Sequence, residues 1–386
     1  MKDVYLTHAA SFLPGAPVTN QTMIDHLGDI DGQSQRIGRL ILRQNKIVTR
    51  YYVPRKGERW QYNNADMAAL AVQGVVGKAG LQASDLDLLA TATTQGDLLV
   101  PGHGSTVHAA LAKLGTVGPL EVASFQSVCA SSLMAAKTAA LNIQAGLATT
   151  SVAVGSEFSS RWFQPEMYRA APDAIADKDI RMAAEFLRWT LSDGAGAILL
   201  QDQPNPKAVS FKVEWIEMVS LAHQFDTCMY AGVGTDDRYE IKQPWSQYGG
   251  GPLRAVEDGA VMLLQDMVLL KRIIRAWVGE YLKLIDRGVV VPAKIDHLLC
   301  HYSAHSLREE IIKILHATGG MIDEENWFSN LATKGNTGSA ALFVMLEEFI
   351  AKGQAKPGEQ ILCIVPESGR AMVGFMMLTV VGARDV

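Results

Sequence analysis

Short apolar runs alternate along the chain with longer stretches of helical periodicity. The runs are typical of strands buried in a sheet, and the stretches near residues 64–80 and 130–145 are typical of helices. The predicted strands are 86–94, 120–125, 151–157 and 195–200, followed by 212–218, 295–300, 360–366 and 373–381. Further long helical stretches are predicted around 255–287. This alternation predicts an α/β protein with a mixed sheet flanked by helices.

The two parts of the chain are similar to each other. Asp87 and Asp296 each open a predicted strand and precede Cys129 and Asn336 by 42 and 40 residues. A helix-like segment then runs from each of these two residues to a glycine 17 positions further on, and a strand ending in "GSE" or "PESG" follows. Agreement of three landmarks indicates a duplicated unit. We therefore expect Cys129 and Asn336 at related places near a pseudo-twofold axis, with a ligand site between the halves.

Composition and charge narrow the classes of function. The 386 residues carry a net charge of −5, and lysine and arginine are scattered, which argues against nucleic acid as a partner. No apolar run is long enough to span a membrane, and the first 18 residues lack signal-peptide organisation, so a cytoplasmic location without membrane association is expected. The four cysteines form no CxxC pair, which disfavours disulfides and structural zinc.

Cys129 lies where a predicted strand meets a predicted helix, within "SFQSVCASSLMAAKTAALNIQAG". At the start of a helix, free backbone N–H groups and the positive end of the dipole favour thiolate over thiol. Small residues follow the cysteine, which allows close packing of the helix and leaves space at its mouth. We therefore expect a nucleophile, and the alternative is a cysteine that only packs in the core.

Two other polar residues complete a recognisable set. His301, within "CHYSA", follows a predicted strand, and Asn336, within "KGNTGSAA", precedes an amphipathic helix that it could also cap. With Cys129 in "VCASS", they resemble in order and spacing the Cys-His-Asn triad of β-ketoacyl-acyl-carrier-protein synthase III (FabH-like) enzymes of the thiolase superfamily. The segment "LSDGAGAILL" (191–200) is similar to a strand of that family.

The resemblance runs from about residue 80 to the C-terminus and implies a duplicated αβαβα layered fold. Residues 1–205 would form a half carrying the nucleophilic cysteine, and residues 206–386 a half carrying histidine and asparagine. It also implies a homodimer and no cofactor besides thioester substrates. Residues 45–53 are most similar to the DarB-type branch, which makes dialkylresorcinol precursors. The chain departs from FabH in "HYSAH" (301–305), where FabH has "HQAN", and in "PESGRA" (366–371), where FabH has a "GGG" loop.

Such a triad suits acyl transfer followed by carbon–carbon bond formation. Cys129 would take an acyl group from coenzyme A or acyl carrier protein, which divides a difficult condensation into two steps. A malonyl or β-ketoacyl thioester would then supply the carbanion in a Claisen-type reaction. We expect His301 Nε2 and the Asn336 amide to stabilise the enolate oxygen, each donor contributing roughly 3 kcal/mol. The backbone N–H groups of Cys129 and Gly369 are expected to bind the acyl carbonyl oxygen.

Other interpretations of the sequence remain open at this point. The fold could serve an acyltransferase with an oxygen or nitrogen nucleophile, or a non-catalytic partner subunit of a synthase. The histidine spacing 297, 301, 305 suits a metal only on a helix, and this segment is strand-like, so no metal site is expected. Residues 225–252 are predicted to be a long ordered loop, either a surface flap or part of a substrate tunnel or dimer contact. Packing roles are assigned to Cys228, Cys300 and Cys363, and structural or peripheral roles to His297 and His305.

Overall fold

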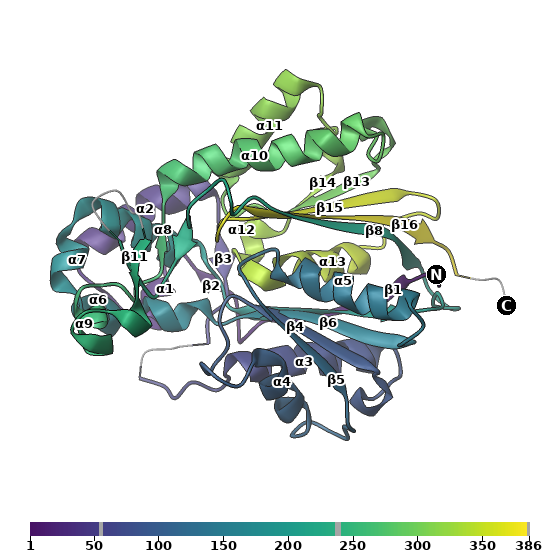
Figure 1. The fold of residues 1–386 in the computed structure, drawn as a ribbon, viewed down its shortest axis with the longest axis horizontal. Coiled ribbons are helices and arrows are strands. Elements are labelled where there is room, and N and C mark those ends of the chain that lie inside the picture. The colour runs from purple at the N-terminus through teal and green to yellow at the C-terminus, as the bar shows by residue number, and fades with distance from the viewer. Residues whose placement is uncertain (54–56, 236–240, 384–386) are drawn as a thin grey trace.

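A computed structural model describes residues 1–53, 57–235 and 241–383. Its elements stack in five layers (Figure 1). Helices α10 (Met267–Asp286) and α11 (His305–Thr318) form one outer layer, and α3 (Asn64–Lys78) and α4 (His103–Leu111) form the other. Helices α5 (Ser131–Gln144) and α13 (Ala341–Ala351) lie in the middle, between two halves of a sheet. The predicted αβαβα layering is therefore present.

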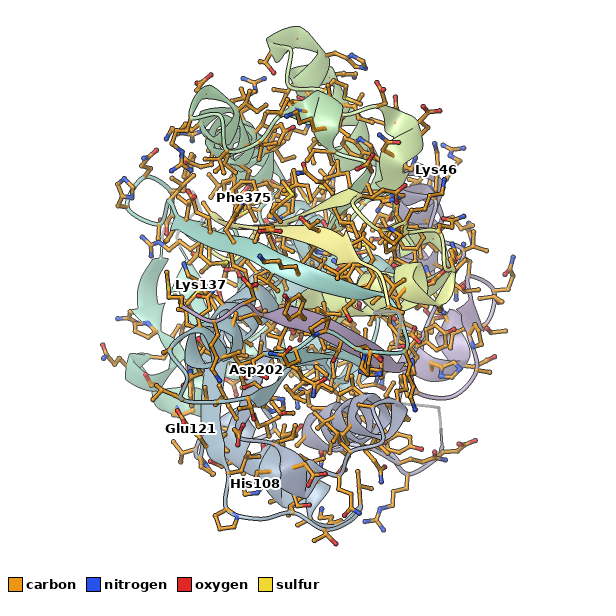
Figure 2. The ribbon with its side chains drawn as sticks, turned by 90° about the vertical axis from the view of Figure 1, so that its right-hand side faces the viewer. Lys46, His108, Glu121, Lys137, Asp202 and Phe375 are labelled. Carbon is orange, nitrogen blue, oxygen red and sulfur yellow. The ribbon has the colours of Figure 1, made fainter. Side chains whose placement is uncertain are left out.

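Ten strands form one continuous sheet in the order β14-β13-β15-β16-β8-β1-β7-β6-β4-β5. The two central neighbours, β1 and β8, pair antiparallel, and the order of strands is symmetric about this pair. The first half contains β1 (Tyr5–Phe12), β4 (Leu88–Thr93), β5 (Glu121–Gln126), β6 (Thr150–Glu157) and β7 (Gly194–Gln201). The second contains β8 (Ser210–Ser220), β13 (His297–Cys300), β14 (Trp327–Phe328), β15 (Gln360–Glu367) and β16 (Met372–Val381). Figure 2 shows the layers end-on, with Glu121 near the lower edge and Phe375 in the upper half.

Strand directions repeat between the halves. In the first half β4 is parallel to β5 and β6, and β6 is antiparallel to β7. In the second half β13 is parallel to β14 and β15, and β15 is antiparallel to β16. Asp87 accepts hydrogen bonds from the Thr149 and Thr150 N–H groups, and Asp296 accepts one from Gln360 N–H at the start of β15. We propose on this basis that residues 1–205 and 206–386 are the two copies of the predicted unit.

The two central helices are buried between the half sheets because their contacting residues are small. Ala135, Ala136 and Ala139 of α5 are completely buried. A β-carbon on Gly155 of β6 would lie 2.5 Å from the Ser339 carbonyl oxygen, so only glycine allows the strand and the start of the second central helix to approach so closely. The layers thus bring the beginnings of α5 and α13 next to the ends of the strands.

One prediction about an element is wrong. The run 120–125 was predicted as buried, but β5 pairs only with β4 within the described residues and is half-buried to exposed, because it forms an edge of the sheet. The helical stretches predicted around 255–287 are two helices: α9 (Gly251–Glu257) ends before Gly259, and a short strand, β12 (Leu264–Gln265), separates it from α10. Helix α10 starts afresh because Asp266 accepts the backbone N–H groups of its first turn.

Shorter elements complete the fold. The remaining helices are α1 (Met23–Leu27), α2 (Gly32–Asn45), α6 (Pro165–Arg169), α7 (Pro172–Ala176), α8 (Lys178–Thr190) and α12 (Leu331–Lys334). The remaining strands are β2 (Val18–Thr19), β3 (Thr49–Arg50), β9 (Met229–Tyr230), β10 (Val233–Thr235) and β11 (Ile241–Pro244). Helices α1, α2 and α6 to α9 gather at one end of the layers, on the left of Figure 1. Of the predicted loop 225–252, residues 236–240 lie outside the described residues. No helix in the described part of the chain combines the length and apolarity needed to cross a bilayer.

Candidate active site

Cys129 lies in the turn between β5 and α5, two residues before the first helical residue, Ser131. The turn is tied by the Ser131 hydroxyl, which donates to the Val128 carbonyl oxygen at 2.7 Å. The cysteine is 6% exposed, and Ala130 and Ser132 beside it are fully buried. The structure therefore places Cys129 at a strand-to-helix junction, as the sequence predicted.

The protonation of Cys129 differs from the expectation. Burial raises the pKa of its thiol well above the ordinary value, and the carboxylates of Glu367 and Glu157 raise this pKa further. A helix start stabilises a nearby anion by about 1 kcal/mol, whereas full burial shifts a pKa by roughly 3–5 units, or about 4–7 kcal/mol. The prediction that the helix start favours thiolate is therefore wrong for the unliganded site, where the thiol is the stable form.

Glu367, the last residue of β15, holds the cysteine turn from the other half of the chain. Its carboxylate accepts the Ser127 hydroxyl at 2.5 Å and the Ala130 N–H at 3.1 Å. It is 2% exposed, and burial raises its pKa. The Ala130 N–H at the start of α5 therefore donates to the Glu367 carboxylate and is not available to stabilise a Cys129 thiolate.

Glu157, the last residue of β6, is the counterpart of Glu367. Its Oε1 accepts Thr94 N–H at 3.1 Å, the Thr94 hydroxyl at 2.6 Å and Ser339 N–H at 3.0 Å. Gly338 packs against this side chain, and a β-carbon there would lie 2.8 Å from Glu157 Cγ. Each carboxylate therefore ends a strand of one half and binds the beginning of the central helix of the other half.

Sequence reasoning missed both glutamates as site residues. The signal was present, because "GSE" and "PESG" end the two repeated strands. A buried carboxylate at the same place in both copies points to a shared structural task, namely satisfying N–H groups at a helix start.

His301 follows β13 directly, and its backbone N–H donates to the Ile364 carbonyl oxygen of β15 at 2.8 Å. Its side chain is 5% exposed, and burial lowers its pKa to about 4. The imidazole is therefore neutral at physiological pH and has one N–H to donate.

The neighbouring histidines have other partners. His297 Nε2 lies 2.9 Å from the Glu359 carboxylate and its ring packs on Phe349, while His305 lies 3.3 Å from Glu309. No group of three His, Cys, Asp or Glu side chains suited to a metal occurs within residues 1–53, 57–235 and 241–383.

Asn336 is positioned by the backbone of the other half. Its N–H donates to the Thr190 carbonyl oxygen at 3.0 Å, and its carbonyl oxygen accepts Ser192 N–H at 2.8 Å. Its side-chain Oδ1 accepts Gly338 N–H at 2.9 Å. This bond fixes the amide so that Nδ2 is its remaining donor. The prediction that Asn336 caps the helix is wrong, because the cap positions of the 338–340 turn and of α13 are Thr337 and Ala340. Its role as a donor to a ligand stays a prediction.

Cys129, His301, Asn336 and Glu157 line one cavity of about 610 Å³. Polar side chains from the strand ends, among them Gln95, Gln126 and Arg161, form part of its wall. The rest is mostly apolar. From the region 225–252, the described residues Thr227, Met229, Tyr230, Ala231, Gly232 and Trp245 line the cavity, so this segment contributes to its wall.

Gly369 lies in the turn between β15 and β16, against Val128. Its carbonyl oxygen accepts the Cys228 N–H at 2.8 Å, and the adjacent Ser368 lines the cavity. The proposed role of its N–H in binding the acyl oxygen stays a prediction.

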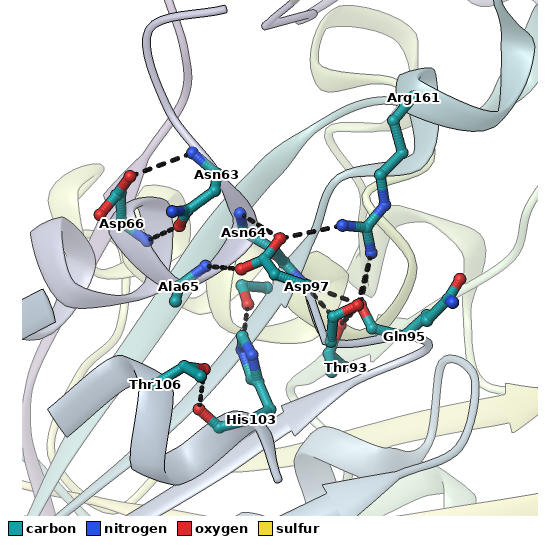
Figure 3. A network of polar contacts seen from close by, with 12 residues as sticks. Asn63, Asn64, Ala65, Asp66, Thr93, Gln95, Asp97, His103, Thr106 and Arg161 are labelled. Carbon is teal, nitrogen blue, oxygen red and sulfur yellow. Dashed lines mark hydrogen bonds and ion pairs between the residues drawn. The ribbon is translucent and has the colours of Figure 1, made fainter. Parts of the chain in front are cut away.

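A buried polar network fixes the loop after β4 (Figure 3). Arg161 forms an ion pair with Asp97 at 2.9 Å and donates to the carbonyl oxygens of Gln95 and Gly96. Asp97 also accepts the N–H groups of Asn64 and Ala65 at the start of α3. This network positions Thr94 and Gln95, and through Thr94 it supports Glu157.

The other three cysteines are buried, and burial raises the pKa of each thiol, that of Cys300 to about 12. Cys228 donates to the Asp266 carbonyl oxygen and accepts from Gln265. Cys300 does not line the main cavity and borders a second, smaller one. These positions agree with the packing roles assigned from the sequence.

Comparisons with known proteins indicate which class of protein this chain resembles. Residues 285–377 match the family model described as 3-Oxoacyl-[acyl-carrier-protein (ACP)] synthase III C terminal. The chain is 26% identical over 360 residues to the beta-ketoacyl-[acyl-carrier-protein] synthase III of Hyphomonas neptunium, covering 93% of both chains. It is similar in fold to the 3-oxoacyl-(acyl carrier protein) synthase III, FabH, of Xanthomonas oryzae (TM-score 0.74, 17% identity, 98% and 99% covered). It is also similar to a single-residue variant of OleA from Xanthomonas campestris (TM-score 0.72, 15% identity, 98% of both chains).

The fold is that of the thiolase superfamily's solved structures. In sequence the chain resembles the FabH-type synthases of that superfamily, most plainly over residues 285–377.

Proposed function

We propose that this protein is an acyl-thioester condensing enzyme of the β-ketoacyl synthase III type, with Cys129 as nucleophile. The observation that carries the proposal is that Cys129, His301 and Asn336, from two halves of the chain, are buried side chains that line one cavity. Relatives at 23–26% identity are named beta-ketoacyl-[acyl-carrier-protein] synthase III, which supports acyl-coenzyme A and acyl carrier protein as partners.

In the first step the Cys129 sulfur attacks the thioester carbonyl, the acyl–sulfur bond of the donor breaks, and its thiol leaves. The Cys129 thiol proton ends on the departing sulfur, so the step is balanced. Because the thiol is the stable form in the free site, attack requires the proton to leave as the new bond forms. The Cys129 and Gly369 N–H groups would stabilise the developing oxyanion.

In the second step a thioester carbanion attacks the acyl-cysteine carbonyl and expels the Cys129 thiolate. The neutral His301 ring and Asn336 Nδ2 donate to the enolate oxygen of the second substrate. A neutral imidazole suits a hydrogen-bond donor better than a general acid, and burial keeps it neutral. The second substrate is a malonyl thioester, which forms the carbanion by losing carbon dioxide, or a β-ketoacyl thioester as in the DarB-type branch, which forms it by losing an α-proton. In the second case the expelled Cys129 thiolate takes up a proton in place of the one lost, which restores the thiol.

Intact-mass measurement after incubation with acyl-coenzyme A tests the first step. We expect one acyl adduct in the native protein and none in Cys129→Ala. His301→Ala and Asn336→Ala are expected to keep the adduct and to lose carbon–carbon bond formation by roughly 100-fold each. Product formation in Cys129→Ala at the native rate would refute the proposal. An adduct that passes only to an alcohol or amine would instead indicate an acyltransferase.

We further propose a homodimer that forms through the β5 edge and acts in the cytoplasm, where its thioester substrates occur. Beyond β5 no strand pairs with it among the described residues, and Leu98, Leu99 and Val100 nearby are exposed. Exposed edges and contiguous apolar residues are typical of interfaces. Sedimentation should give a mass of two chains, and Val100→Asp should shift it toward one. A native monomer at micromolar concentration would contradict this proposal.

A further inference from the structure

One arm of the main cavity runs between α10 and α11, and its wall is apolar. The residues that these helices contribute are Leu270, Ile274, Trp277, Leu307 and Ile311, and Leu187 and Leu191 join them from the end of α8. No charged or amide side chain occurs among these seven. Polar wall residues come from other segments, among them Gln95, Gln126 and Arg161 of the first half and Thr227, Gln265 and Ser303 of the second. An arm of this kind suits an alkyl chain, because a pantetheine group carries two amides that need hydrogen-bond partners.

A second cavity, of about 30 Å³, lies behind this arm. Ile274, Trp277, Ile311 and Pro366 border both cavities. The remaining wall of the second cavity comes from α10, α11, β13 and the segments that follow, and its polar groups are the hydroxyl of Tyr281, the thiol of Cys300 and the indole N–H of Trp327. The small space is therefore separated from the arm by a thin wall of side chains rather than by backbone layers.

Trp277 is the largest of the four shared side chains, and it is 7% exposed. Its indole N–H has no hydrogen-bond acceptor among the described residues. In contrast, Trp327 on the far wall donates its indole N–H to the Ile322 carbonyl oxygen at 2.9 Å. Because a buried N–H without an acceptor costs stability, the contribution of Trp277 must come from the volume it fills.

We propose that Trp277 forms the end of the acyl-binding arm and sets the longest alkyl chain that Cys129 accepts. The inference rests on the proposed function and names its substrate class, a fatty acyl thioester whose chain lies between α10 and α11. Replacing the indole with a smaller side chain joins the arm to the second cavity and makes room for additional methylenes. Each methylene that moves from water into the enlarged arm favours acylation by about fourfold.

The test is acylation of the full chain with acyl-coenzyme A substrates of increasing length, followed by intact mass and initial rates. For native protein we expect a chain length beyond which kcat/KM falls. Trp277→Ala should move this limit to longer chains by two or more methylenes, so that the ratio of kcat/KM for long substrates to that for short ones rises. Ile311→Phe should move the limit to shorter chains, because this side chain borders the same wall.

Leu284→Ala is the matched control. Leu284 lies on α10 and is completely buried, but it lines neither cavity. Leu284→Ala therefore shows what a loss of helix stability does to acylation when the arm itself is unchanged. An unchanged limit in Trp277→Ala, or an equal shift in Leu284→Ala, overturns the inference. If Trp277→Ala does not fold, the Ile311→Phe result decides, and an unchanged limit there overturns the inference as well. Failure of the proposed function is distinct from these results, since native protein would then form no Cys129 adduct with any chain length.

Discussion

Replacing Glu367 with glutamine should make Cys129 more acidic. The glutamate charge raises the thiol pKa, and only burial has a larger effect. Glutamine fits the same contacts, because its Oε1 can accept Ala130 N–H while its amide donates to the Ser127 oxygen. The substitution therefore removes the charge and keeps the turn that holds the cysteine.

The size of the effect follows from Coulomb's law. The carboxylate bonds to the residue next to Cys129, so its charge lies roughly 6 Å from the sulfur. At an effective dielectric constant of about 20, two unit charges at this separation interact by about 2.8 kcal/mol, or about two pKa units. Burial raises the pKa of Glu367, which opposes ionisation of its carboxyl, and we expect the thiol pKa to fall by about one to two units in the glutamine variant.

The assay is the pH dependence of Cys129 alkylation by iodoacetamide, followed by peptide mass mapping. In Glu367→Gln the midpoint of the rate profile should move to lower pH by one to two units. Glu367→Asp, which retains the charge, should stay within about half a unit of the native midpoint. A midpoint that is unchanged or higher in Glu367→Gln would refute the electrostatic explanation and leave burial alone as the cause.

Three further predictions concern stability. Gly338→Ala should lower the free energy of unfolding by at least about 1 kcal/mol in urea titrations, because φ is +52° there and Glu157 fills the space; native stability would contradict this. The lowered pKa of His301, about 4 against 6.5, means that the folded state binds fewer protons, so stability falls as the pH drops from 6.5 to 4 by up to about 3 kcal/mol. His301→Gln should remove this acid-dependent loss of stability. If the stability of the variant depends on pH as that of the native protein does, His301 is not its cause. Asp296→Ala should cost about 1 kcal/mol by thermal unfolding and Asp87→Ala more, because Asp87 accepts three hydrogen bonds and Asp296 accepts one from Gln360; a smaller loss in Asp87→Ala would contradict this.

Periodicity and repeats predicted most of the fold. The eight predicted strands all occur, and equal spacing from Cys129 and Asn336 to the following strands indicated a duplicated unit that the symmetric sheet order matches. The position of the β5 edge was not predictable, because an apolar run in an edge strand and one in a central strand look alike until the neighbours are known. Asp266 could have shown the break before α10, since aspartate before a helical run is a cap signal.

The sequence was less informative about the chemical state of the site. It placed the cysteine at a helix start, but the thiol pKa depends on which groups the other half brings there. Glu367 follows Cys129 by 238 residues, and no local pattern connects them. The residues that line the cavity could not be predicted either. Trp277 and Ile311 belong to ordinary amphipathic helices, and their inner faces meet a cavity only when the layers are folded together.

The site can exist only when both halves are folded together. Glu157 of the first half binds Ser339 N–H beside Asn336, and Glu367 of the second half binds Ala130 N–H beside Cys129. In isolation, the second half would leave Glu367 without Ser127 and Ala130, and the first half would leave Glu157 with Thr94 alone. Each central helix would also lose the acceptor at its start, at a cost of roughly 1–3 kcal/mol. The β1–β8 pair that joins the halves is short, with two pairs of residues in register. The carboxylates of Glu157 and Glu367 therefore fix the beginnings of α5 and α13 relative to each other. In this way they also position the Cys129 sulfur and the Asn336 amide on the wall of one cavity.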